Sequence, residues 1–476
     1  METLLKVLSE NEKTQVHERT LKILAETGVQ VNTEKGVQYL KEAGAIVDEN
    51  SRIVRFPRSL VEESLKLAPK EFSLGARRPG WDLSMNAGDC FLIADGEGTS
   101  VIDRKTGEHR PSTFNDWLEA TLLIDALDEI GVYWAMAERG EEDETVLNSV
   151  TYWRHLFNNF SKHVQDGSPK AEHSHWLLRI LQTIYGDKQT IRRTHPFSFL
   201  ICPQSPLTIE GKYTDAYLEI LGWDIPVAVM PMPLMGGTGP GNMLSMAILG
   251  NCEVLSMLCL IQAAAPGNPF IYAPALAVMN PRTGMYSAGA IENGLLSCAA
   301  IEMARYYNLP VEGSGGGTDT FSPGIQASYE RAMNGMLPML SWPDLMVGAG
   351  LLGGSMVLSL EQLLIDTEIF RMNKQAHRGI HADEAMWLDD VIQSVGPGGN
   401  FLGEKSTAVS MRSGEWLIPR IGSHQTRTAW ENSGQKTILD EARNKVDILL
   451  AEHEPLRLSP EVEKELFLIE QQAKEI

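Results

Sequence analysis

Residues 309–324 read LPVEGSGGGTDTFSPG, and this stretch sets the pattern for the fold. A short apolar run at 309–311 leads into glycines at 313 and 315–317, and a helical segment follows from about residue 325. Glycine carries no Cβ, so the backbone of such a loop can approach a ligand closely. We interpret the stretch as a buried strand that ends in a loop beside a binding site.

The same design occurs twice more along the chain. Residues 225–231 (IPVAVMP) run into MPLMGGTGPGN, and residues 345–350 (LMVGAG) run into LLGGSM. Glycines also mark ordinary turns, so any one of these loops could be a simple turn and not part of a binding site. Repetition at the same end of successive strands favours one cavity with a backbone floor and side chains from the loops.

Apolar, strand-like runs alternate with helical segments over roughly 250 residues after Ser112, which is typical of a parallel sheet wrapped by helices. The expected strands are 130–136, 163–165, 197–202, 225–230, 270–273, 311–314 and 345–348. The expected helices include 208–221, 242–264, 291–307, 326–336 and 358–372. This pattern predicts an α/β fold, a TIM (β/α)8 barrel, with the eighth strand at 379–382 or 400–402. An open doubly wound sheet is the alternative.

The two ends of the chain predict additions to the barrel. Residues 1–112 are expected to form an N-terminal helical and β-hairpin cap, with Ser9 capping the first helix and a hairpin turn at 105–107. The barrel would then span 113–435, and charged amphipathic helices would form a C-terminal extension at 436–476.

Composition excludes several classes of function. A formal net charge of −21 argues against nucleic acid as a partner. Five cysteines without a CxxC pair predict reduced thiols and no thiolate zinc site. The start lacks the pattern of a signal peptide, and Asn251 and Glu253 interrupt the most apolar window, so a buried helix is favoured over a membrane span. We therefore expect a cytoplasmic protein.

Functional side chains in a barrel lie at the C-terminal ends of its strands and in the loops that follow. Aromatic rings there could form a cage for an alkylammonium ion, which each ring face would attract by about 0.5–2 kcal/mol. The alternative for each ring is packing in the core or at the rim of the barrel. The aromatic candidates are Tyr272, Tyr286 and Phe321, with Tyr133, Trp134 and Phe401 as further members.

Polar candidates would recognise the other end of a ligand. Arg282 could bind a carboxylate with its planar fork or form a surface ion pair, and Gln165 is a second donor. Glu253, inside an apolar helix, must either pair or serve a site. Asp319 lies in the polar part of the opening stretch. Exposed backbone N–H groups can also bind anions, and the candidate glycines are Gly236, Gly237, Gly315, Gly316 and Gly317.

Other chemistry has weaker support in the sequence. His377 and His381 are four residues apart, but Arg378-Gly379 between them weakens the helix that a shared metal would need. No nucleophile elbow, Walker loop or dinucleotide fingerprint occurs. We therefore expect no metal ion bound to this chain.

Four phrases together resemble the trimethylamine methyltransferase superfamily, and the similarity extends over nearly the whole chain. They are PLMGGTGPGNMLSMAILGNCEVL, MNPRTGMYSAGAIENGLLSCAAIEMARYYNLPV, GSGGGTDTFSPGIQASYERA and VGPGGNFLGEKST. The resemblance implies a TIM barrel that moves a methyl group from an amine to the Co(I) of a corrinoid (cobalamin) carried by a separate protein. The chain contains only standard residues, so it resembles the non-pyrrolysine branch, whose members demethylate quaternary amines such as glycine betaine, proline betaine and carnitine.

The chemistry of a quaternary amine agrees with the absence of an acid–base pair. Its leaving group is a neutral tertiary amine, so the protein needs only to orient the cation and exclude water. We expect glycine betaine as the methyl donor and dimethylglycine as the product. The alternatives are another quaternary amine such as choline, a non-catalytic betaine-binding protein, or a barrel enzyme of another class such as a metal-dependent lyase. A homo-oligomer is compatible with the sequence, which does not require one.

Overall fold

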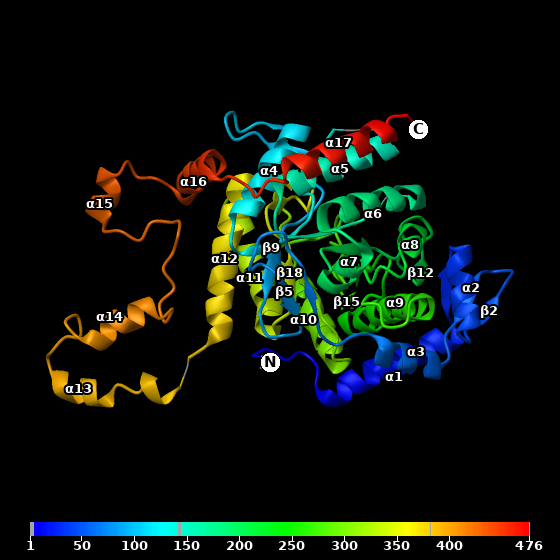
Figure 1. Cartoon of the computed structure of the whole chain (residues 1–476). Helices are drawn as coiled ribbons and strands as arrows, with labels where there is room; N and C mark the ends of the chain where they lie inside the picture. The colour runs from blue at the N-terminus through cyan, green and yellow to red at the C-terminus, as the bar shows by residue number, and fades with distance from the viewer. Residues whose placement is uncertain (1–3, 141–143, 169, 381, 476) are drawn as a thin grey trace.

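The computed structural model describes residues 4–140, 144–168, 170–380 and 382–475 (Figure 1). Its centre is an eight-stranded parallel sheet in the order β15-β13-β11-β10-β9-β6-β18-β17. A parallel bridge between Tyr272 and Val311 joins the two outer strands and closes the sheet into a barrel. The strands are β6 (Phe91–Ile93), β9 (Ile130–Tyr133), β10 (His163–Asp166), β11 (Phe197–Ile201), β13 (Val227–Val229), β15 (Phe270–Tyr272), β17 (Glu312–Ser314) and β18 (Leu345–Val347). The predicted (β/α)8 barrel is confirmed, and the open sheet is excluded.

The strand missing from the sequence prediction is β6, which pairs with β18 on one side and β9 on the other. The placement of the eighth strand at 379–382 or 400–402 was wrong. Gly379 ends helix α12 and residues 400–402 form a turn, while His381 lies outside the described residues. β6 lies within the apolar run CFLIA at residues 90–94, but short β segments surround this run, so the sequence assigned it to the N-terminal cap and not to the barrel.

A short hairpin fills the N-terminal end of the barrel. Its strands are β4 (Phe72–Leu74) and β5 (Leu83–Met85), which pair antiparallel. Leu74, Leu83 and Met85 pack in one cluster with the inward side chains of the barrel strands. Among the described residues, the hairpin therefore covers the end of the barrel interior opposite the C-terminal ends of the strands.

Helix α9 (Met243–Ala264) is the centre of the packing outside the barrel. It packs against α10 (Ile291–Tyr306) and against three N-terminal helices, α1 (Glu10–Glu26), α2 (Glu34–Glu42) and α3 (Arg58–Leu67). α9 is long and apolar enough to cross a membrane, but 83% of its apolar window is buried inside the structure. It is a core helix, as predicted.

The N-terminal region is attached to the barrel by a second sheet. Strands β1 (Val29–Val31), β2 (Ile46–Asp48) and β3 (Ile53–Arg55) are antiparallel neighbours, and β1 also pairs with β12 (Thr208–Ile209) from the loop after β11. Ser9 caps α1, as predicted, and it forms a capping box with Glu12, because each side chain accepts a hydrogen bond from the other's backbone N–H.

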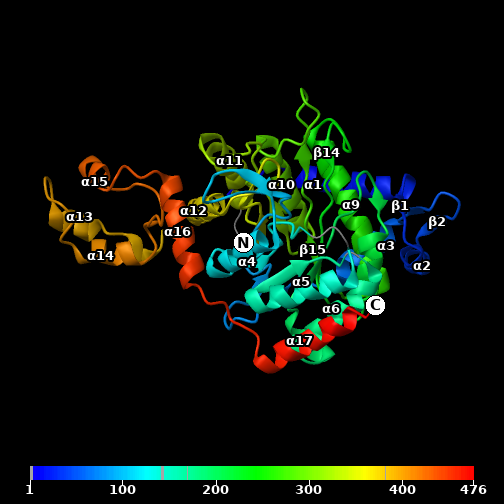
Figure 2. The same cartoon turned by 90° about the horizontal axis from the view of Figure 1, so that it is seen from above.

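The remaining helices wrap the barrel or extend from it (Figures 1 and 2). Those around the barrel are α4 (Phe114–Ala126), α5 (Val146–Asn159), α6 (Ala171–Tyr185), α7 (Lys188–Thr194), α8 (Lys212–Leu218), α11 (Ile325–Ser341) and α12 (Leu360–Arg378). After α12 the chain leaves the body through η1 (Glu384–Met386), α13 (Asp389–Val395), α14 (Lys405–Arg412) and α15 (Arg427–Asn432). It returns with α16 (Ile438–Glu452) on α12 and α4, and α17 (Pro460–Ala473) on α5 and α6.

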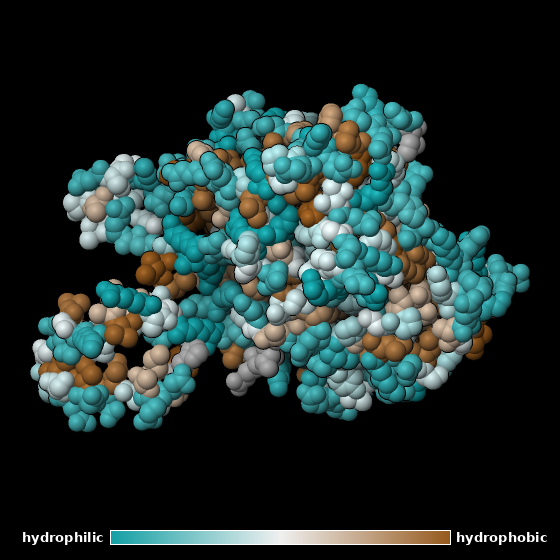
Figure 3. Space-filling model, in the orientation of Figure 1, coloured by the Kyte–Doolittle hydropathy of each residue, from teal (hydrophilic) through white to brown (hydrophobic). Residues whose placement is uncertain are grey.

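Small sheets extend the strands beyond the barrel. β14 (Leu234–Met235) pairs with β16 (Ala277–Val278), while β19 (Leu351–Leu352) and β20 (Val357–Leu358) join the hairpin of β7 (Ser100–Ile102) and β8 (His109–Pro111). That hairpin contains the predicted turn at 105–107. Apolar side chains also gather on the lower half of the projecting segment, where Figure 1 places α13 and α14 (Figure 3).

A candidate substrate cavity at the mouth of the barrel

A cavity of about 520 Å³ lies at the C-terminal ends of strands β6, β9, β10, β11 and β13, with α5 and α8 beside it. Its size falls within the range of about 300–1,000 Å³ that is usual for small-ligand pockets. Its lining residues are Gly96, Glu97, Trp134, Ala135, Arg139, Glu144, Asn148, Ser149, Tyr152, Trp153, Gln165, Asp166, Gly167, Leu200, Cys202, Tyr213, Met230 and Met232. This is the position at which barrel enzymes place their active sites.

A buried polar chain forms the floor of this cavity. Trp134 Nε1 donates to Gln165 Oε1 at 2.7 Å, and Gln165 Nε2 donates to Glu312 Oε2 at 3.2 Å. Glu312 is 1% exposed, and its Oε1 has no hydrogen-bond partner among the described residues. Burial raises the pKa of Glu312 to about 8, against the opposing effect of the Gln165 hydrogen bond. Glu312 does not line the cavity, but it lies directly behind the lining residue Gln165, where a cation in the cavity would favour its ionised form.

Carboxylates also line the wall. Asp166 Oδ2 accepts from the Tyr152 hydroxyl at 2.7 Å, and Asp166 Oδ1 accepts from the Gly167 N–H at 2.7 Å. Burial raises the pKa of Asp166. Burial, and next the charge of Asp166, raises the pKa of Glu97 to about 7. The Glu97 side chain nevertheless keeps about half of its surface accessible, because it faces the cavity.

The net charge of the wall is negative. Glu97, Glu144 and Asp166 line it, and Arg139 is the only cationic side chain among the described lining residues. Arg139 lies 3.8 Å from Glu97 as an ion pair, and its guanidinium stacks 4.1 Å from the centre of the Tyr152 ring. An acidic, partly desolvated wall with tryptophan rings beside it favours an organic cation over an anion.

Two of the residues proposed from the sequence lie in this cavity. Gln165 and Trp134 line it, on alternate strand positions that point inward. Tyr272 and Tyr133 point the other way. The Tyr272 hydroxyl donates to Asn251 Oδ1 on α9 at 3.0 Å, and the Tyr133 hydroxyl accepts from Trp117 Nε1 at 2.8 Å. Both tyrosines therefore pack between the barrel and its outer helices.

Three other candidates lie on the opposite half of the rim. The Phe321 ring covers Gly353, where an added Cβ would lie 2.5 Å from it, and the Tyr286 ring lies beside Gly354. Asp319 accepts from Ser287 Oγ at 2.8 Å and from the Gly289 N–H at 3.2 Å. These contacts hold the loops after β15, β17 and β18 together, and none of the three candidates lines the 520 Å³ cavity.

The remaining side-chain candidates are distributed over the surface and the packing. Arg282 is exposed in a turn, and Phe401 lies on the segment that projects from the body. Glu253 accepts from Ser205 Oγ and from the Leu207 N–H, both at 2.8 Å. The sequence left open whether Glu253 pairs within the protein or serves a site. In the structure its carboxylate is paired with hydrogen-bond donors of the loop after β11.

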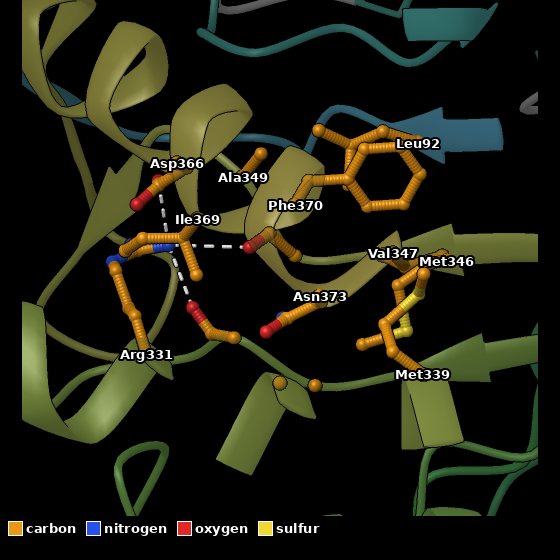
Figure 4. A pocket seen from close by; sticks show the side chains of 14 residues that line it. Leu92, Arg331, Met339, Met346, Val347, Ala349, Asp366, Ile369, Phe370 and Asn373 are labelled. Carbon is orange, nitrogen blue, oxygen red and sulfur yellow. Dashed lines mark hydrogen bonds and ion pairs between the residues drawn. The ribbon is translucent and has the colours of Figure 1, made fainter. Parts of the chain in front are cut away.

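The candidate glycines follow the strands as predicted but contact protein. Gly236 and Gly237 are exposed in the loop after β14. Gly315 and Gly316 border a separate cavity of about 30 Å³ between β18 and helices α11 and α12 (Figure 4). There Arg331 donates to the Gly316 carbonyl at 2.6 Å and pairs with Asp366 at 2.8 Å.

The neighbouring backbone donors are also occupied. The Gly316 N–H donates to Asn334 Oδ1 at 2.6 Å, and the Gly315 N–H donates to the Val347 carbonyl at 3.1 Å. A Cβ at Gly317 would lie 2.8 Å from the Ala288 carbonyl oxygen. The close approach that these glycines permit is therefore to helices and loops of the same chain.

Sequence reasoning missed Glu97, Arg139, Tyr152, Asp166 and Glu312. Glu97 follows β6, the strand that was not found. Glu312 stands in the opening stretch, and a lone carboxylate within an apolar strand is the signal that could have identified it.

A metal site has no support in the described part of the chain, where no three His, Cys, Asp or Glu side chains are arranged to hold an ion. His377 stacks on the Trp342 ring with centroids 3.7 Å apart. His381, its proposed partner, lies outside the described residues.

Comparison with known proteins identifies the family of this chain. Residues 2–475 match the family model for trimethylamine methyltransferase (MTTB). The trimethylamine methyltransferase MttB of Desulfitobacterium hafniense (strain DSM 10664 / DCB-2) is 30% identical over 450 residues, which is 94% of this chain and 90% of that protein. The glycine betaine methyltransferase of D. hafniense (strain Y51) is 28% identical over 478 residues, or 99% and 98% of the two chains.

A solved structure shows the same fold. The monomethylamine methyltransferase (MtmB) of Methanosarcina barkeri superposes with a TM-score of 0.52 over 92% of each chain, at 13% identity. The chain therefore belongs to the trimethylamine methyltransferase family.

Proposed function

We propose that the protein transfers a methyl group from a quaternary amine, with glycine betaine as the favoured donor, to the Co(I) of a corrinoid carried by a separate protein. The remaining product is dimethylglycine. Family membership supports methyl transfer from an amine, and the glycine betaine methyltransferase that the chain resembles supports this donor. The observation that carries the proposal is the acidic, aromatic cavity at the mouth of the barrel.

Glycine betaine has a trimethylammonium group and a carboxylate only a few ångströms apart, so its site must present both charges. The cation would lie against Trp134 and Asp166, where carboxylate charge and a π face coincide. The carboxylate would face Arg139, in place of the Arg282 considered from the sequence. Arg139 is held 3.8 Å from Glu97, which positions its guanidinium beside the cation site.

The protein's part in the reaction is binding, orientation and exclusion of water. The corrinoid supplies a strong nucleophile that takes the methyl carbon as the C–N bond breaks. The bonding electron pair stays on nitrogen, so a neutral tertiary amine leaves and no side chain has to donate a proton. Asp166 and Glu97 stabilise the cation before transfer, and the Trp134–Gln165 hydrogen bond fixes the aromatic wall.

The test supplies the purified protein with reduced cobalamin and, in separate reactions, glycine betaine, proline betaine, carnitine, choline and trimethylamine. We expect a change in the corrinoid absorption spectrum and dimethylglycine by mass spectrometry with glycine betaine. Transfer from trimethylamine alone would overturn the choice of substrate class. Binding of glycine betaine without transfer, also with a cognate corrinoid protein present, would favour a betaine-binding protein.

A further inference from the structure

The segment that projects from the body has no core of its own. We define the arm as residues 380–413, which contains η1, α13 and α14. No residue described in this range is buried. Residues 414–420 contact the body again, where Arg371 donates to the Ile418 carbonyl and Arg378 pairs with Glu415. Helices of seven and eight residues without tertiary packing are not stable alone in water.

The arm nevertheless carries a large apolar surface. Nine large apolar side chains on it are between 36% and 95% exposed. They are Ile380, Met386, Trp387, Leu388, Ile392, Phe401, Leu402, Val409 and Met411. At roughly 100 Å² each, they would supply about 900 Å², close to the ~800 Å² per partner of a standard protein interface. Figure 3 shows apolar residues among polar ones on this part of the molecule.

A matching face lies on helix α11 of the same chain. Ile325, Tyr329 and Met333 are four residues apart and 88%, 57% and 55% exposed, so they form one apolar stripe. The charged residues of α11, Glu330 and Arg331, are both buried. A 17-residue helix whose exposed face carries no charge is unusual for a surface in water and typical of the core of an interface.

We propose that the arm of one copy covers the α11 stripe of a second copy of this chain. In the view from above, helix α11 lies on the side of the barrel from which the arm projects (Figure 2). An isologous dimer requires each copy to offer both surfaces, and this chain carries both, so in the proposed dimer each arm would cover the other copy's α11. An arm without a core needs its partner at all times, which a second copy provides and a transient partner does not.

The test compares matched single substitutions in the full chain. Ile392→Asp changes the arm and Tyr329→Asp changes the stripe, while Ile46→Asp is the control. Ile46 and Ile392 are the same residue type and each is 61% exposed, but Ile46 lies in β2 in the N-terminal region, at the opposite end of the molecule from the arm (Figure 1). Circular dichroism and thermal unfolding verify that each variant is folded.

Sedimentation velocity at micromolar concentration gives the outcome. We expect the natural chain and Ile46→Asp to sediment as a dimer or a multiple of it. The two interface variants should shift to the 52.6 kDa monomer, with a dissociation constant at least 100-fold higher. A monomeric natural chain would overturn the proposal, and so would an unchanged mass for both interface variants.

A second measurement separates contacts within a copy from contacts between copies. A benzophenone attached at Ile392→Cys is photolysed in a mixture of ¹⁴N-labelled and ¹⁵N-labelled chains, and peptides linked to α11 are analysed. Mixed-isotope pairs support the exchange of arms. Same-isotope pairs alone would show that the arm folds back on its own chain, which contradicts the proposal.

Discussion

Replacing Asp166 with asparagine tests whether the cavity wall binds a cation. Asparagine keeps the shape of the side chain and can still bond with the Tyr152 hydroxyl, so the change removes mainly the charge. Two unit charges about 5 Å apart attract by about 3 kcal/mol at an effective dielectric constant near 20. Arg139 repels the same cation, so we expect a net loss of about 2 kcal/mol, or about 30-fold in Kd for glycine betaine.

The assay is isothermal titration at pH 8, where Glu97 is ionised. The neutral isostere 3,3-dimethylbutyrate, which has carbon in place of nitrogen, controls for shape and should not bind more weakly to the variant. Glu144→Gln is the matched protein control. Glu144 also lines the cavity, but its side chain is 49% exposed and paired with Lys212, so its loss should change Kd less than 3-fold. Equal weakening of both ligands by Asp166→Asn would refute the electrostatic reasoning.

Four further predictions concern the cavity and its surroundings. Cation binding favours the ionised form of Glu97, whose pKa is about 7, so affinity for glycine betaine should decrease as the pH falls through 7. Ionisation of Glu312, whose pKa is about 8, should add a further rise in affinity at higher pH. Glu97→Gln should remove the step near pH 7, and an unchanged profile would contradict the assignment. Arg139→Ala should raise KM more for glycine betaine than for choline, which lacks the carboxylate. Arg282 lies in an exposed turn, so Arg282→Ala should leave both KM values unchanged. An equal rise in KM for both substrates with Arg139→Ala would mean that Arg139 does not bind the carboxylate. Tyr272→Phe should lower the free energy of unfolding by about 1 kcal/mol through its lost hydrogen bond to Asn251, with KM unchanged, and a raised KM would return this ring to the site. Prolonged chelation should leave activity intact, and one equivalent of zinc lost together with activity would show a metal site.

The strands that could be predicted from the sequence are those with long apolar runs before a glycine-rich loop. β6 was assigned to the cap because its apolar run, residues 90–94, lies between two hairpins and before the alternation of strands and helices begins. The prediction of the site residues was limited by a different ambiguity, which concerns the face of the strand on which a side chain lies. All four residues of β9 are buried, since one face of the strand meets the barrel interior and the other meets helices. Trp134, which follows β9 directly, is buried as Tyr133 is, so burial does not distinguish the two rings. Their packing in the closed sheet shows that Trp134 faces the cavity.

The same ambiguity explains the placement of Tyr272 and Glu312. An aromatic ring at the end of an apolar strand predicts a cage only if its position points inward, and Tyr272 points to α9. Glu312 directly follows the outward-facing Val311 and points to Gln165. A carboxyl group facing the interior was the stronger signal, because burial of a carboxylate has a cost that packing alone does not explain.

The hairpin of β4 and β5 covers the N-terminal end of the barrel interior, so the cavity is reached from the C-terminal ends of the strands. Under the proposed function, the amine enters and the demethylated product leaves through the face at which the methyl acceptor must dock. While the acceptor occupies that face, neither small molecule can exchange with solvent. The amine must then bind before the acceptor docks, and the demethylated product must leave after the acceptor has dissociated. The use of one face by all three molecules therefore sets the order of the catalytic cycle.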